Sequence, residues 1–85
     1  MANYTIVLSK KAQRQLDKLS NKVADPIINA IACLATNPRP IGCKKLIDRS
    51  GYRIRIGDYR IIYDIFDKEL VVDIITLGHR KDIYG

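Results

Sequence analysis

Tryptophan is absent from this sequence of 85 residues, and cysteine occurs only twice, as Cys33 and Cys43. Two cysteines cannot form the disulfide framework of a small secreted domain, and no Cys/His cluster has the spacing of zinc ligands. No apolar run approaches the roughly 20 residues of a membrane-spanning helix, and the N-terminal residues lack the pattern of a signal peptide. We therefore expect one cytoplasmic domain over residues 1–85, with no membrane contact, metal or cofactor.

Positive charge is abundant and unevenly distributed. Lys and Arg outnumber Asp and Glu by 15 to 9, which gives a net charge of +6. The surplus is concentrated between residues 39 and 60, where seven basic side chains stand against two acidic ones. Such a concentration is typical of a surface that binds nucleic acid or an acidic protein, although it also occurs on ordinary solvated surfaces.

The first half of the chain has a helical pattern after one short strand. Residues 4–8 form a β-rich run, and apolar residues at helical spacing then begin after Ser9, whose hydroxyl suits an N-cap. A second helix is predicted from about residue 22 to residue 36, where the sequence Asn-Pro-Arg-Pro stops it. Because the link between them is short, the two helices should form an antiparallel hairpin.

The second half is β-like. Strands are predicted over residues 44–47, 52–56, 59–66 and 70–77, with tight turns at 57–58 and 67–68. Helices followed by strands indicate an α+β domain, in which the helical hairpin packs on one face of a mainly antiparallel C-terminal sheet.

The turn between the second and third of these strands fixes a register. If its Gly-Asp pair forms a two-residue type II′ turn, Arg55 lies directly opposite Arg60, and Arg53 shares their face. Like charges that face each other destabilise a strand pair unless an anion bridges them, and guanidinium groups match phosphate oxygens. The alternative is that the three arginines extend into solvent or pair with the carboxylates of Asp58 and Asp64.

The C-terminal residues add further polar groups. His79 is the only histidine, and its side chain titrates near neutral pH. Arg80 follows the last predicted strand, and Tyr84 lies four residues later. Taken singly, His79 is an ordinary surface residue and Tyr84 an aromatic anchor. Together with the arginines they provide what phosphodiester cleavage needs, namely cations on the phosphate and a proton donor and acceptor.

Residues 51–65 and 71–84 resemble toxins of the RelE/ParE superfamily, and most closely its RelE branch. The resemblance rests on the motifs Tyr-Arg-x-Arg, Tyr-Arg-x-x-Tyr and Gly-His-Arg…Tyr. It implies a RelE-like fold and a toxin of a type II toxin–antitoxin system that cleaves mRNA in the ribosomal A site. In that reaction the 2′-hydroxyl of the mRNA attacks the adjacent phosphate without a metal.

The resemblance also implies roles for individual residues. Arg60 and Arg80 would clamp the scissile phosphate, and Tyr84 would stack on a base or take part in proton transfer. Arg53 and Arg55 match two basic RNA-binding positions of the family. Lys44 and Lys45 belong to the same basic stretch of the chain and are expected to bind RNA phosphates together with these arginines.

One departure from the family concerns the general base. The best-known RelE toxins carry lysines where this chain has Arg53 and Arg55, and an arginine effectively cannot lose its proton. His79 is therefore the expected base, since its pKa suits proton transfer at neutral pH.

The expected partners follow from the same resemblance. They are the ribosome with its mRNA, and an acidic antitoxin that folds on binding and covers part of the helical hairpin or the sheet edge. The toxin–antitoxin complex would bind operator DNA through the antitoxin. Two alternatives remain open: a ParE-like poison of DNA gyrase with the same fold, and a catalytically inert antitoxin-binding or autoregulatory module.

Overall fold

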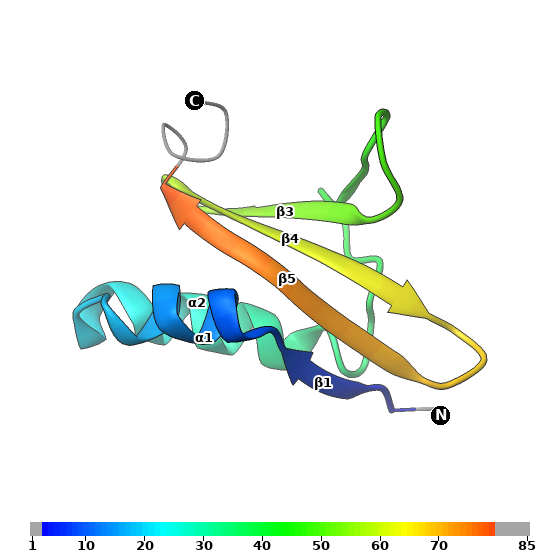
Figure 1. The fold of residues 1–85 in the computed structure, drawn as a ribbon, viewed down its shortest axis with the longest axis horizontal. Coiled ribbons are helices and arrows are strands. Elements are labelled where there is room, and N and C mark those ends of the chain that lie inside the picture. The colour runs from blue at the N-terminus through cyan, green and yellow to red at the C-terminus, as the bar shows by residue number, and fades with distance from the viewer. Residues whose placement is uncertain (1–2, 80–85) are drawn as a thin grey trace.

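The computed structural model describes residues 3–79, which form a five-stranded sheet and two helices (Figure 1). In chain order the elements are β1 (Thr5–Leu8), α1 (Lys10–Asp17), α2 (Asn21–Cys33), β2 (Lys44–Lys45), β3 (Tyr52–Ile56), β4 (Tyr59–Phe66) and β5 (Val71–His79). The predicted α+β order of strand, two helices and C-terminal strands is confirmed. Among the described residues no helix is long and apolar enough to cross a membrane.

The sheet is mixed, with the strand order β1-β5-β4-β3-β2. The four C-terminal strands pair antiparallel, as predicted. The N-terminal strand adds a parallel pair, because β1 runs alongside β5 in the same direction. The last of the described strands, β5, is therefore interior to the sheet, between β1 and β4.

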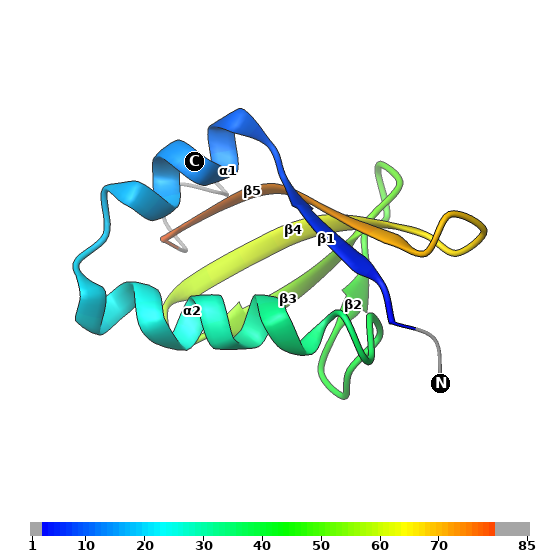
Figure 2. The ribbon, with the colours of Figure 1, turned by 90° about the horizontal axis from the view of Figure 1, so that it is seen from below.

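Both helices lie on one face of the sheet and run across it in opposite directions (Figures 1 and 2). This arrangement follows from the apolar stripe of α2 and from the alternation of apolar residues along the strands. The core between these layers is built from aliphatic side chains and one tyrosine, with Ile27, Ile31, Leu34, Ile54, Ile61, Tyr63, Val72, Ile74 and Leu77 all buried.

Helix α1 begins at the predicted N-cap and also closes one edge of the sheet. The Ser9 hydroxyl accepts the Ala12 N–H at 3.0 Å and donates to the Ile75 carbonyl at 2.6 Å. Further along the helix, Gln15 Oε1 accepts the Leu77 N–H at 2.9 Å. These side chains replace the strand neighbour that β5 loses where β1 ends, so the backbone at this edge is satisfied.

Several predicted boundaries were wrong, and the strand predicted over residues 44–47 already ends at Lys45. Helix α2 ends at Cys33 instead of residue 36, because the chain tightens into i→i+3 bonds at Ala35 and Thr36 before Pro38. The second turn spans four residues instead of two, since Phe66 pairs with Val71. Leu70, which was predicted to begin the last strand, has a positive φ of 54° and belongs to this turn. The strand ends at His79, two residues later than predicted.

A polar cluster secures the linker between α2 and β2 at the end of the sheet that lies away from the β3–β4 turn. Arg39 donates to both carboxylate oxygens of Asp67, at 3.2 and 2.9 Å, and its guanidinium lies 5.2 Å from the ring centre of Tyr52. The Tyr4 hydroxyl donates to Asp67 at 2.7 Å. The hydrogen bonds from Arg39 and Tyr4 lower the pKa of Asp67 to about 2.

Candidate nucleic-acid interface

The β3–β4 hairpin has the predicted register. Gly57 has a φ of 59°, whereas Asp58 has no positive φ, which fits a type II′ turn and excludes type I′. Ile56 therefore pairs with Tyr59, and Arg55 pairs with Arg60. The prediction that two arginines face each other across this hairpin is confirmed.

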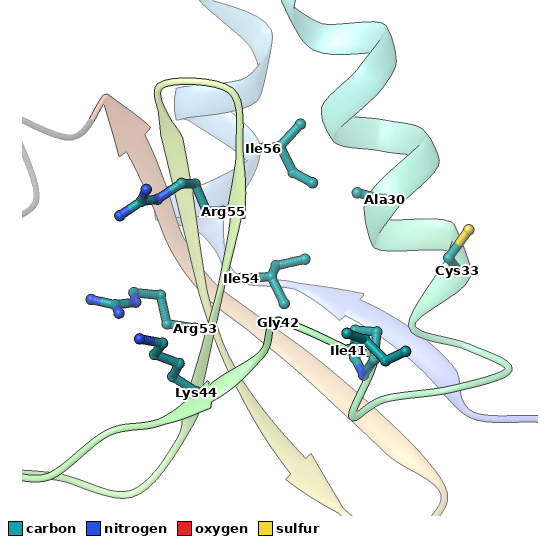
Figure 3. Close-up of a pocket in the computed structure, with 10 residues that line it drawn as sticks. Ala30, Cys33, Ile41, Gly42, Lys44, Arg53, Ile54, Arg55 and Ile56 are labelled. Atoms are coloured by element: carbon teal, nitrogen blue, oxygen red, sulfur yellow. The ribbon is translucent and has the colours of Figure 1, made fainter.

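Four cations from three strands share one face of the sheet. Arg53 lies two residues before Arg55, and Lys44 of β2 is the cross-strand partner of Arg53. Since directly paired residues lie on the same face, Lys44 and Arg53 join Arg55 and Arg60. We call these four residues the cationic face. Figure 3 shows Lys44, Arg53 and Arg55 pointing to the side away from α2.

The cationic face contains two pairs of like charges, Lys44 with Arg53 and Arg55 with Arg60. Such pairs are unfavourable by themselves and become favourable when an anion binds between them. Arg60 is 5% exposed, and its partner on β5 is Gly78, which has no side chain. Arg60 therefore sits in the middle of the sheet, packed on all sides, while Arg55 is exposed to solvent. A nearly buried guanidinium beside an exposed one suits a site that binds a phosphate.

His79 lies on the opposite face of the sheet. It pairs with Tyr59, whose ring packs against the core, and the two rings meet edge to face with centres 5.6 Å apart. Both rings line a cavity of about 250 Å³ beside α2. The alternation of side chains along β5 explains why His79 lies on this face. His79 follows buried Leu77 by two residues, whereas Gly78 shares the face of Arg60.

The remaining predicted site residues are separated from the cationic face or lie outside the described residues. Lys45 pairs with Tyr52, so it points to the face opposite Lys44. Arg80 and Tyr84 lie outside the described residues. Within residues 3–79 no group of three or more His, Cys, Asp or Glu side chains is arranged to hold a metal ion.

A groove beside the cationic face was not predicted from the sequence. It has a volume of about 470 Å³ and lies between β3, the C-terminal half of α2 and the linker that follows α2. Apolar side chains form its walls and three members of the cationic face form its rim (Figure 3). The sequence offered one signal for it: Ile41 is an isolated aliphatic residue between Pro40 and Gly42, and it is fully exposed.

The fold thus places two helices on one face of a mixed sheet and facing arginines on the other. The family model of the ParE toxin of type II toxin–antitoxin systems, parDE, matches residues 6–84. The chain belongs to this family and, more broadly, to the RelE/ParE superfamily of type II toxins.

Curated relatives are RelE-like. Toxin RelG of Mycobacterium tuberculosis is 31% identical over 83 residues, which cover 95% of both chains. Toxin RelE of the same organism is also 31% identical over 83 residues, covering 95% of this chain and 86% of the relative.

Solved structures with the same fold include toxin–antitoxin complexes. The RelBE2 complex of M. tuberculosis matches with a TM-score of 0.82 and 29% identity, covering 94% of each chain. The archaeal RelE–RelB complex of Pyrococcus horikoshii matches with a TM-score of 0.82 and 27% identity, covering 92% of this chain and 96% of that one. The protein is therefore a RelE-like type II toxin, and the predicted RelE-like fold is confirmed.

Proposed function

We propose that this toxin is a ribosome-dependent endoribonuclease that cleaves mRNA in the A site and so inhibits translation. The observation that carries the proposal is the cationic face, on which Arg55 lies opposite a nearly buried Arg60. A ribose-phosphate backbone is an anion whose oxygens match guanidinium groups arranged in this way. The 31% identity to toxins named RelG and RelE favours the same function.

In the proposed reaction the mRNA 2′-oxygen attacks the adjacent phosphorus, and the bond from phosphorus to the 5′-oxygen breaks. The products are a 2′,3′-cyclic phosphate and a free 5′-hydroxyl, so the proton leaves the nucleophile and another reaches the 5′-oxygen. Arg60 and Arg80 would stabilise the charge that develops on the phosphoryl oxygens. Tyr84 would stack on a base or transfer a proton, and Lys44, Arg53 and Arg55 would hold flanking phosphates. Lys45 points to the other face of the sheet and is not part of this contact.

The proton acceptor that we propose is His79. It is adjacent in sequence to Gly78, the β5 partner of Arg60, but its ring starts on the helix side of the sheet. To serve as the base it must approach the phosphate around the end of β5, where the described strand stops.

The variant His79→Ala tests this role in a translation reaction with purified ribosomes. Loss of a general base should lower the cleavage rate by about 10²-fold or more and change the shape of the pH–rate profile. Near-normal cleavage with an unchanged pH profile would exclude His79 as the base. Tyr59→Phe is a matched control, because it alters the ring that contacts His79 and keeps the imidazole.

Primer extension on translated mRNA, after induction of the toxin, tests the proposed function as a whole. Breaks at A-site codons are the expected result. The second candidate is poisoning of DNA gyrase, which the match to the ParE family model favours. Gyrase-linked DNA breaks with intact mRNA would establish that candidate instead, and neither lesion would indicate an inert antitoxin-binding or autoregulatory module.

The proposed partners are a cognate antitoxin, the ribosome and its mRNA, with operator DNA bound through the antitoxin and the toxin acting in the cytoplasm. Support for the antitoxin comes from the fold neighbours, several of which are complexes of a RelE with a RelB.

A further inference from the structure

Strand β5 contains a glycine, Gly78, that its backbone conformation does not require. Glycine weakens a strand, because it loses more backbone entropy on folding than other residues and offers no side chain for packing. Among the glycines that the structure describes, those with a positive φ are Gly42, Gly51 and Gly57, and all three lie outside the strands. Gly78 is not one of them and lies within β5. A glycine inside a strand without such a conformation is typical of a place where a ligand approaches the backbone closely.

Gly78 lies beside the nearly buried arginine of the cationic face. On β4, Arg60 has Gly78 of β5 as its partner on one side and Arg55 of β3 on the other. Arg60 is only 5% exposed, so little of its side chain is open to a ligand. A Cβ atom at position 78 would lie about 5 Å from the Cβ atom of Arg60, on the same face. Glycine therefore removes the side chain that would stand closest to Arg60 on β5.

The charges on this face favour an anion at the hairpin end of β4 and β5. Asp64 and Asp73 are cross-strand partners on the same two strands, and Asp64 follows Arg60 by four residues. Because side chains alternate along a strand, both carboxylates share the face of Arg60 and lie about 13 Å further along it. A phosphate is attracted to the arginines and repelled by the aspartates. On this pair of strands it is therefore expected beside Arg60 and Gly78.

We propose that the scissile phosphate rests against the backbone of β5 at Gly78 while Arg60 binds its oxygens. The inference rests on the proposed function and specifies where on the sheet the reacting phosphate lies. A methyl group at position 78 would hold the phosphate away from Arg60. A displacement of about 1 Å at the reacting group costs on the order of 10²-fold in rate.

The variant Gly78→Ala separates this role from a structural one, because the two roles predict opposite shifts of the Tm. If the glycine serves only the ligand, alanine restricts the unfolded chain and should raise the Tm by about 2–8 °C. If the space beside Arg60 instead serves packing, the added methyl group overfills it and lowers the Tm. A lower Tm for Gly78→Ala in a thermal melt would overturn the proposal.

RNA binding tests the same contact without cleavage. With a labelled single-stranded RNA oligonucleotide, Gly78→Ala should lose the phosphate contact of Arg60, which flattens the log–log salt dependence of the affinity by about 0.7. In a translation reaction with purified ribosomes, kcat/KM for mRNA cleavage should fall by about 10- to 100-fold. Val71→Ile is the matched control, because it adds one methyl group to the same face of β5 at its other end, where Val71 pairs with Phe66. Its salt dependence and cleavage rate should equal those of the unsubstituted toxin.

The outcomes distinguish a failure of this contact from a failure of the proposed function. A salt dependence and a cleavage rate that Gly78→Ala leaves unchanged would overturn the contact at Gly78 and leave the proposed function in place. Equal losses in Gly78→Ala and Val71→Ile would also overturn it, since the effect would then not depend on the neighbour of Arg60. Absence of mRNA cleavage by the unsubstituted toxin would overturn the proposed function, and this inference with it.

Discussion

Removing the Arg55 guanidinium should flatten the salt dependence with which this toxin binds single-stranded RNA. Each phosphate contact releases counterions, so the affinity falls with salt by a log–log slope of about −0.7 per contact. One phosphate contact from each of the four residues of the cationic face contributes about −2.8 to this slope. Raising the salt from about 50 to about 200 mM should therefore weaken binding roughly 50-fold. For Arg55→Ala the slope becomes about −2.1, and the same change of salt weakens binding only about 20-fold.

Fluorescence anisotropy with a labelled RNA oligonucleotide at several salt concentrations measures this slope. Arg55 is exposed on β3, beyond the residues with which β2 pairs, so its truncation leaves the core intact. Arg14→Ala is the matched control, since it removes the same charge from the exposed side of α1, on the other face of the sheet. Its slope should stay near that of the unsubstituted toxin. Equal slopes for the two variants would refute the reasoning, because the RNA would then respond to net charge and not to the cationic face.

Two further predictions concern stability. The buried Tyr63 hydroxyl donates to the Pro38 carbonyl at 2.8 Å. Tyr63→Phe should therefore lower the free energy of unfolding by about 1.5 kcal/mol and the Tm by roughly 6–12 °C in a thermal melt. An unchanged Tm would show that this hydrogen bond contributes nothing to stability. The lowered pKa of Asp67 means that its carboxylate stabilises the fold above its ordinary pKa of about 4, and that this contribution is lost as the pH falls toward about 2. The Tm of the unsubstituted protein should therefore exceed the Tm of Asp67→Asn at neutral pH, and the two Tm values should converge in this acidic range. A difference in Tm that stays constant with pH would contradict the role of the Arg39 contact.

The sequence predicted the hairpin and its facing arginines because their geometry depends on local rules. A glycine followed by aspartate between two alternating runs specifies a two-residue turn, and that turn sets which side chains face each other. The register of Arg55 and Arg60 followed from these few residues alone. The N-cap at Ser9 was predictable for the same reason, since its partner lies three residues away.

Features that depend on distant parts of the chain were not predictable in this way. The polar contacts of Arg39 with Asp67 join residues that are 28 positions apart, and no local sequence pattern predicts these contacts. The groove exists because β2 stops after two residues, which depends on how the linker packs. The face of His79 was available from the alternation of β5, but only once the strand was known to continue past Leu77.

The position of β5 has a consequence for how the chain acquires its shape during synthesis. Of the described strands β5 is made last, yet it lies between β1 and β4, and its contacts with the N-terminal part of the chain span 66 positions, as between Ser9 and Ile75. Until β5 emerges from the ribosome, neither β1 nor the inner edge of β4 has a partner, and closing so long a loop makes folding slow. A nascent chain therefore cannot complete this sheet until β5 has left the ribosome.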